Sequence, residues 1–133
     1  MRDFTERIET EVYQAITRDE AIDAAFTVDD YETHPLVEIG DVLLEQEVFP
    51  KQQWYRVQVG IRIEAKFNNA KQEVNELSDT CIALLEDSFK MAWNGMIIHS
   101  YAFSVRRGKF LSQDGNWIQE KDITATLLIE LLN

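Results

Sequence analysis

The chain has 133 residues, 45% of them hydrophobic and 28% charged, which fits a single globular domain spanning residues 1–133. Its net charge is −11, and the whole excess lies early: residues 1–50 hold 14 acidic and 3 basic side chains, whereas residues 51–133 hold 10 of each. A protein that wraps nucleic acid needs the opposite sign, and a membrane span needs about 20 consecutive apolar residues, so neither class is expected.

An amphipathic helix is predicted over residues 3–17. Asp3 and Glu6 have capping-box spacing, and apolar side chains recur at helical intervals at Phe4, Ile8, Val12, Ala15 and Ile16. Residues 18–25 are expected to form a short second helix with Ile22 inward. A polar connector over residues 27–35 then ends at Pro35, which disfavours helix at the residue before it.

Two strands are predicted next. Residues 36–45 are rich in β-branched side chains and broken by Gly40, where we expect a bend or bulge. Residues 54–66 alternate strictly, which predicts a strand with one buried face formed by Val57, Val59, Ile61, Ile63 and Ala65.

A further helix is expected to begin after Asn68 and Asn69, which would cap it, and to end near Ser88. Its inner stripe is Val74, Leu77, Cys81, Leu84 and Leu85. Because the single cysteine, Cys81, stands in this stripe, we interpret it as a buried hydrophobic side chain. Because a single cysteine cannot form an internal disulfide and residues 1–6 have no apolar leader, a reducing, cytoplasmic site of synthesis is expected.

The last part of the chain predicts two more strands. Residues 96–105 would place one set of side chains on a common face: Ile97, His99, Tyr101, Phe103 and Val105. Residues 106–116 are expected to form a loop or splayed hairpin that turns at Asp114-Gly115. Residues 117–132 would bury Ile123, Ala125, Leu127, Ile129 and Leu131. The resulting order predicts an α+β fold: a four-stranded, mainly antiparallel sheet with both helices packed on one face.

Patterns typical of catalysis or cofactor binding are missing from the sequence. There is no glycine-framed serine and no glycine-rich phosphate loop, and the two histidines stand far apart, at His34 and His99. We therefore predict a non-enzymatic protein with no cofactor and no metal. Two alternatives stay open. One is a magnesium or calcium site at Asp29, Asp30 and Glu32, and the other is a ligand-binding domain or enzyme with a pocket at His99, Tyr101 and Asp122.

One segment has the composition of a protein interface. The predicted loop combines basic, apolar and aromatic side chains, namely Arg106, Arg107, Lys109, Phe110, Leu111 and Trp117. Two leucines on the outer face of the last strand, Leu128 and Leu132, are further interface candidates, because a neighbouring subunit could cover them. The alternative is a plain mobile hairpin whose Trp117 enters the core.

Order, spacing and length together resemble the tail terminator (tail completion) proteins of siphophages along almost the whole chain. The resemblance rests on Pro35-Leu36-Val37-Glu38-Ile39-Gly40, the alternating segment 54–64, the helix 70–85, and the turn Asp114-Gly115-Asn116-Trp117 with the strand that follows it. None of these motifs is specific by itself, so their combination carries the resemblance. The segment 18–34 departs from the family pattern because it is longer and more acidic.

The resemblance implies a structural subunit of the virion tail at the head–tail junction, assembled in the host cytoplasm. Six copies would form a hexameric ring on the head-proximal end of the tail tube. This homo-oligomer would contact the tail tube protein on one side and the head connector or a head-completion protein on the other. DNA would pass through the ring without being specifically bound, and an acidic wall would repel its phosphates. The alternatives of the same class are another head–tail neck component and a tail tube protein.

Overall fold

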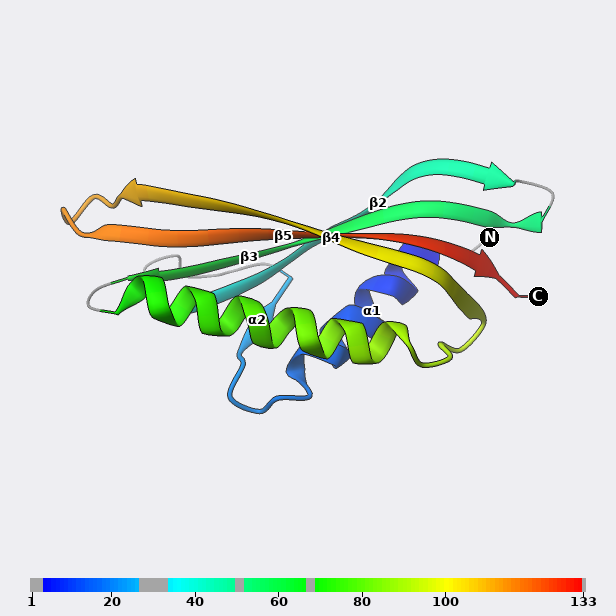
Figure 1. Ribbon diagram of the computed structural model, residues 1–133, viewed down its shortest axis with the longest axis horizontal. Coiled ribbons are helices and arrows are strands. Elements are labelled where there is room, and N and C mark those ends of the chain that lie inside the picture. The colour runs from blue at the N-terminus through cyan, green and yellow to red at the C-terminus, as the bar shows by residue number, and fades with distance from the viewer. Residues whose placement is uncertain (1–3, 27–33, 50–51, 67–68, 133) are drawn as a thin grey trace.

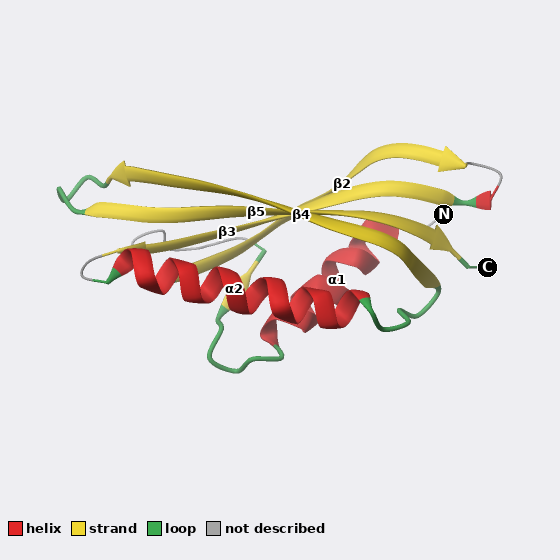
Figure 2. Cartoon of the chain, in the orientation of Figure 1, coloured by secondary structure: helices red, strands yellow, loops and turns green. Residues whose placement is uncertain are grey.

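The computed structural model of the protein describes residues 4–26, 34–49, 52–66 and 69–132. The elements follow in the order α1 (Phe4–Thr17), β1 (Ala24–Ala25), β2 (Leu36–Phe49), β3 (Trp54–Lys66), α2 (Ala70–Phe89), β4 (Met96–Leu111) and β5 (Trp117–Leu131). The strands form one twisted sheet, and both helices lie against the same face of it (Figure 1). We call the opposite face, which no described helix covers, the outer face (Figure 2).

The sheet has the strand order β1-β2-β3-β5-β4. Its four long strands pair antiparallel, whereas β1 runs parallel to β2. The predicted α+β class is therefore correct, but the sheet is mixed and five-stranded rather than four-stranded. β1 consists of two alanines opposite Val37 and Glu38, and such a short apolar pair carries no periodic pattern from which to predict a strand.

Helix α1 buries the five side chains of its predicted stripe. Its first ring, Phe4, lies 4.9 Å from the ring of Tyr55 in β3. The helix also bonds to strand β2, because the backbone N of Val42 donates a hydrogen bond to Glu9 Oε1 at 3.1 Å. The predicted cap residue Asp3 lies outside the described residues.

The predicted helix over residues 18–25 is wrong. The chain turns at Asp19, whose backbone O accepts from the N of Ile22 at 3.0 Å and whose Oδ1 accepts from the N of Ala21 at 2.9 Å. An aspartate that bonds to the backbone two residues on favours a turn over a helix. Ile22 is nevertheless buried, as predicted.

Helix α2 begins and ends within one residue of the predicted limits. Val74, Cys81 and Leu85 are buried, and the other two members of the predicted stripe are half-buried against the core. Asn69 stands at the N-cap but makes no side-chain cap hydrogen bond. It adopts a left-handed backbone conformation with φ 67°, which asparagine tolerates better than most residues. Asn69 therefore contributes to the start of the helix through its backbone conformation and not through a side-chain cap. Asn68 lies outside the described residues.

Strand β4 is longer than predicted. The predicted loop over residues 106–116 is wrong in its first half, because positions 106–111 continue the ladder with β5. Only the turn at residues 112–116 remains, and there the predicted Asp114-Gly115 turn is confirmed: Gly115 has φ +85° and its N donates to the O of Ser112 at 3.0 Å.

A register shift between Ile98 and Ser100 changes which side chains of β4 face the helices. The extra residue of such a bulge reverses the alternation before it. Ile98 therefore packs against the core, whereas Ile97 is exposed and His99 stacks on Trp54 of the outer face. The predicted common face is wrong for Ile97 and His99 and correct for Tyr101 and Phe103, which pack against the core, and Val105 is exposed.

The predicted irregularity near Gly40 is confirmed. The register between β2 and β3 shifts between Ile39 and Val42, and two more shifts follow before Phe49. A Cβ atom at Gly40 would lie 3.2 Å from the backbone O of Gly60. Glycine at position 40 thus allows β2 to approach β3 closely at the shift.

The core lies between the helices and the two central strands, β3 and β5. Directly opposed residues of these strands are at most 1% exposed, in the pairs Val57–Leu127, Val59–Ala125 and Ile61–Ile123. This confirms the buried faces predicted from the alternation in both strands. The open outer face and the two sheet edges therefore carry the remaining functional possibilities.

Truncation of the central core should cost far more stability than the same truncation at the surface. Leu127→Ala removes a fully buried side chain and is expected to lower the free energy of unfolding by about 2–5 kcal/mol. Leu43→Ala is the matched control, because that leucine is 56% exposed. Urea denaturation of both variants measures the difference, and equal losses would contradict this description of the core.

Candidate functional site

The basic and aromatic residues predicted as an interface gather at the free end of the β4–β5 hairpin (Figure 1). Three apolar side chains remain solvent-accessible there: Phe110 is 40% exposed, Leu111 57% and Trp117 52%. These exposures exclude the alternative in which Trp117 enters the core. Lys109 Nζ lies 4.6 Å from the centroid of the Trp117 ring, a cation–π contact. We call residues 106–111 and 117 the hairpin tip.

The two leucines predicted as further interface residues lie away from the hairpin tip. Leu128 is half-buried on the outer face, between Arg56 of β3 and Ser100 of β4. Leu132 follows β5 and is 48% exposed, at the opposite end of the hairpin from its turn. The structure thus brings together six of the eight predicted residues and separates the other two from them.

The turn of the hairpin is held by a carboxylate. Asp114 pairs with Lys66 at the end of β3, and it accepts from the hydroxyl of Ser112 and from the backbone N of Asn116 at 3.1 Å. The bond from Lys66, followed by those from Ser112 and Asn116, holds the pKa of Asp114 well below its usual range. Lys66 is itself 5% exposed, so this pair fixes the hairpin to the body of the sheet.

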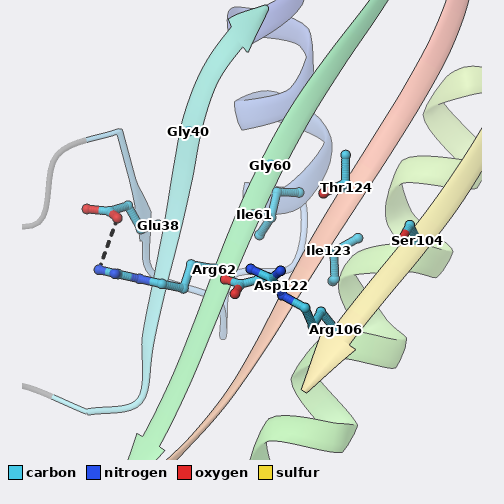
Figure 3. A pocket seen from close by; sticks show the side chains of 10 residues that line it. All are labelled: Glu38, Gly40, Gly60, Ile61, Arg62, Ser104, Arg106, Asp122, Ile123 and Thr124. Atoms are coloured by element: carbon cyan, nitrogen blue, oxygen red, sulfur yellow. Dashed lines mark ion pairs between the residues drawn. The ribbon is translucent and has the colours of Figure 1, made fainter. Parts of the chain in front are cut away.

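A row of alternating charges crosses the outer face at one level of the sheet. Glu38, Arg62, Asp122 and Arg106 lie opposite one another on β2, β3, β5 and β4 (Figure 3). Arg62 Nη2 lies 3.1 Å from Glu38 Oε1, and its Nε lies 3.1 Å from Glu64 Oε2. Opposite charges on facing strands stabilise a sheet, so this row helps to fix the register of the four strands.

Beside the charged row the outer face is hollowed to a volume of about 450 Å³. Its floor lies where Gly40 and Gly60 adjoin, and Ser104 and Thr124 line it as well (Figure 3). The space exists because glycine has no side chain and the side chains of serine and threonine are small. The four residues of the charged row also line the hollow. The hollow is open and wide rather than a deep pocket, which suits contact with a protein surface better than enclosure of a small molecule.

A second layer of carboxylates adjoins the row. Glu64 and Glu120 face each other on β3 and β5. Burial raises the pKa of Glu120, the charges of Asp122 and Glu64 add to this, and Arg62 opposes it. Glu64 is almost fully buried and contacts His34, whose Nε2 lies 3.3 Å from Glu64 Oε1. His34, Glu64, Arg62 and Glu38 thus form a connected polar network on the outer face.

His99 belongs to a different cluster and does not meet its predicted partners. Its ring stacks on Trp54 with centroids 3.9 Å apart, and its Nε2 lies 2.9 Å from Glu130 Oε1. Tyr101 packs instead against Phe89 on the helix side of the sheet. Asp122 lies on β5 opposite Arg106 of β4, which is seven residues after His99. His99 is thus a hydrogen-bonded histidine of the edge strand β4, and the three side chains suggested to share a pocket do not converge.

The remaining candidate groups offer little chemistry. Burial, and then the charge of Asp19, raises the pKa of the Cys81 thiol to about 12, which keeps it protonated and unreactive. The suggested cation ligands at positions 29, 30 and 32 lie outside the described residues. Among the residues that are described, no group of three or more His, Cys, Asp or Glu side chains could hold a metal ion, and no helix is long and apolar enough to cross a membrane.

The two long strands nearest the sides of the sheet, β2 and β4, differ sharply in charge, a feature that was not predicted from the sequence. β2 contains four acidic residues and no basic one, namely Glu38, Asp41, Glu45 and Glu47. β4 contains no acidic residue and carries Arg106, Arg107 and Lys109. This difference in charge can be seen in the sequence once both segments are known to be strands. The strand order places β2 and β4 towards opposite sides of the sheet.

No family model matches this sequence, and a search of curated proteins found no match to it.

Removal of the Asp114 carboxylate should destabilise the protein in a pH-dependent way. Because the folded state lowers the pKa of Asp114, its contribution is present at neutral pH and is lost as the pH falls through the acid range. Asp114→Asn is therefore expected to lower the urea midpoint at neutral pH and to differ little from the wild type in strong acid. Asp79→Asn, at an exposed position on α2, is the control. A constant difference between Asp114→Asn and the wild type at every pH would contradict the assignment.

Proposed function

We propose that this chain is a structural subunit of a phage-type tail, a tail terminator that forms a hexameric ring on the head-proximal end of the tail tube. The ring would stop polymerisation of the tube and provide the surface for head attachment. The observation that carries this proposal is the exposure of adhesive surface on the single chain: two long strands at the sides of the sheet, and a basic, aromatic hairpin tip.

The exposed strand edges favour an assembled state. β4 spans 16 residues, and β5 is the one described strand that pairs with it. A long edge strand presents a row of backbone donors and acceptors to any other chain, and proteins usually cover such edges. A cyclic ring of identical subunits covers the two sides of each copy with those of its neighbours, which leaves no open end.

The hairpin tip supports a second kind of contact, with a different protein. Phe110, Leu111 and Trp117 together with the basic residues beside them have the composition of a binding surface. The tip lies at the end of the sheet opposite to the end of β2 and the start of β3 (Figure 1). In a terminator ring it would meet either the last ring of tube protein or the head connector.

The charge of the chain suits a passage for DNA. Six copies of a chain with net charge −11 make a strongly acidic ring. Acidic side chains facing the lumen would repel phosphate and let DNA pass without being held. The alternative roles in the same apparatus are a tube protein, which would polymerise without limit, and another neck component.

The native mass of the purified chain and its effect on tube growth test the proposal. We expect closed rings of one size by electron microscopy and native mass spectrometry, and shorter tubes when the chain is added to polymerising tube protein from the same source. Long filaments of this chain alone would instead favour a tube protein. A chain that neither forms rings nor limits tube growth would overturn the proposal.

The hairpin tip should be needed for binding to the tube or connector but not for folding. A Phe110→Ser, Leu111→Ser variant is expected to keep the thermal midpoint of the wild type, since both side chains are exposed, and to lose its effect on tube length or head attachment. Met91→Ser is the control, because Met91 is an equally exposed apolar residue outside the tip. An unchanged effect of the tip variant in both assays would refute this role.

A further inference from the structure

We propose that neighbouring copies of this chain meet edge to edge, the basic end of β4 on one copy lying against the acidic side of β2 on the next. This inference rests on the proposed function, since it specifies how the subunits of the ring make contact. Its basis is the opposite charge of the two long strands at the sides of the sheet.

The charges that would meet are accessible on each copy. Arg106, Arg107 and Lys109 are exposed on β4, and Asp41, Glu45 and Glu47 are exposed on β2. Helix α1 adds to the acidic side, because it packs against β1 and β2. Glu9 of the helix accepts from the backbone N of Val42, and Glu20 and Asp23 are exposed in the segment that leads into β1.

The regularity of the backbone makes β4 better suited than β2 to form hydrogen bonds with a strand of another copy. Between Ser100 and Leu111, β4 pairs with β5 without any register shift, so its other edge presents a regular row of peptide groups. β1 covers β2 only at Val37 and Glu38, and no described strand pairs with that edge beyond them. Because β2 carries three register shifts, its contact with a neighbour would depend chiefly on side-chain charge.

The charges also select the kind of symmetry. Two β4 edges would bring basic side chains together, and two β2 edges would bring carboxylates together, so like pairings are disfavoured. Only the unlike pairing attracts, and an unlike, head-to-tail contact produces a ring when its rotation closes.

The strand register adds a geometric consequence. Arg106 is level with Glu38, the position that β1 covers, whereas the accessible part of β2 lies beyond it. Adjacent copies must therefore be staggered along the strand direction for Arg106 to reach Glu45 or Glu47. Stagger of this kind accompanies the tilted strands of any closed barrel, so it is compatible with a ring.

Charge reversal on each side tests the pairing. One variant carries Arg106→Glu, Arg107→Glu and Lys109→Glu, and the other carries Asp41→Lys, Glu45→Lys and Glu47→Lys. Each alone is expected to lose the ring and behave as a monomer in native mass spectrometry. An equimolar mixture should recover rings in which the two variants alternate, because each reversed edge then meets its complement. Higher salt should weaken the wild-type ring, since screening reduces attraction between exposed charges.

Matched controls separate this contact from a general charge effect. Glu73→Lys, Glu76→Lys and Asp79→Lys on α2 reverse three acidic side chains, the same number as in the β2 variant, and Lys90→Glu at the C-cap of α2 reverses a basic side chain outside both strands. Both controls should keep the ring. Circular dichroism and urea unfolding establish that each variant is folded, and Gln substitutions at the three basic positions provide a milder set for the same assay.

The outcomes distinguish this inference from the proposed function. Rings of wild-type mass in both reversed variants would overturn the inference and leave the terminator role standing. Loss of the ring in the β4 variant alone, or no recovery on mixing, would overturn it too, because β4 would then contact some surface other than β2. If the wild-type chain assembles only on tube ends, the same variants and their mixture are compared by their effect on the length of polymerising tubes. A wild-type chain that forms no ring and caps no tube would overturn the proposed function itself.

Discussion

The burial of one sheet face by two helices is the constraint on which the rest of this structure depends. β3 and β5 lie at the centre and contribute side chains that are almost fully excluded from water, against stripes from α1 and α2. Apolar burial on this scale is the main stabilising term available to a chain of this size. Because both helices are used on one face, the opposite face and the sides of the sheet must be compatible with water or with another protein.

The outer face meets that demand by internal pairing. Arg62 contacts Glu38 and Glu64, and Glu64 also contacts His34, so these four side chains have polar partners on the same face. The sides of the sheet are handled differently. β4 has basic side chains and β2 has acidic ones. In the proposed ring these opposite charges would attract neighbouring copies to each other.

Sequence patterns predicted what hydrophobic burial controls. The alternation in residues 54–66 and 117–132 identified both central strands and their inner faces, since burial on one side imposes a period of two. The end of β4 was missed because an exposed edge strand needs no such alternation. A single bulge at His99 reversed the facing of the residues before it. The charged row on the outer face depends on strand register, which joins Glu38 to Arg106 across four strands and leaves no local signal in the chain.

The packing of Phe4 on Tyr55 has a practical consequence for the connectivity of the molecule. Tyr55 lies opposite Ile129 near the end of β5, so the start of α1 and the end of the last strand share one pole of the domain. The Ser112–Asn116 turn occupies the other pole. A peptide joining position 132 to position 4, with new ends opened in that turn, would give a circular permutant that keeps every described helix and strand intact. Fluorophores attached at Phe4 or Leu132 would likewise stand away from the hairpin tip.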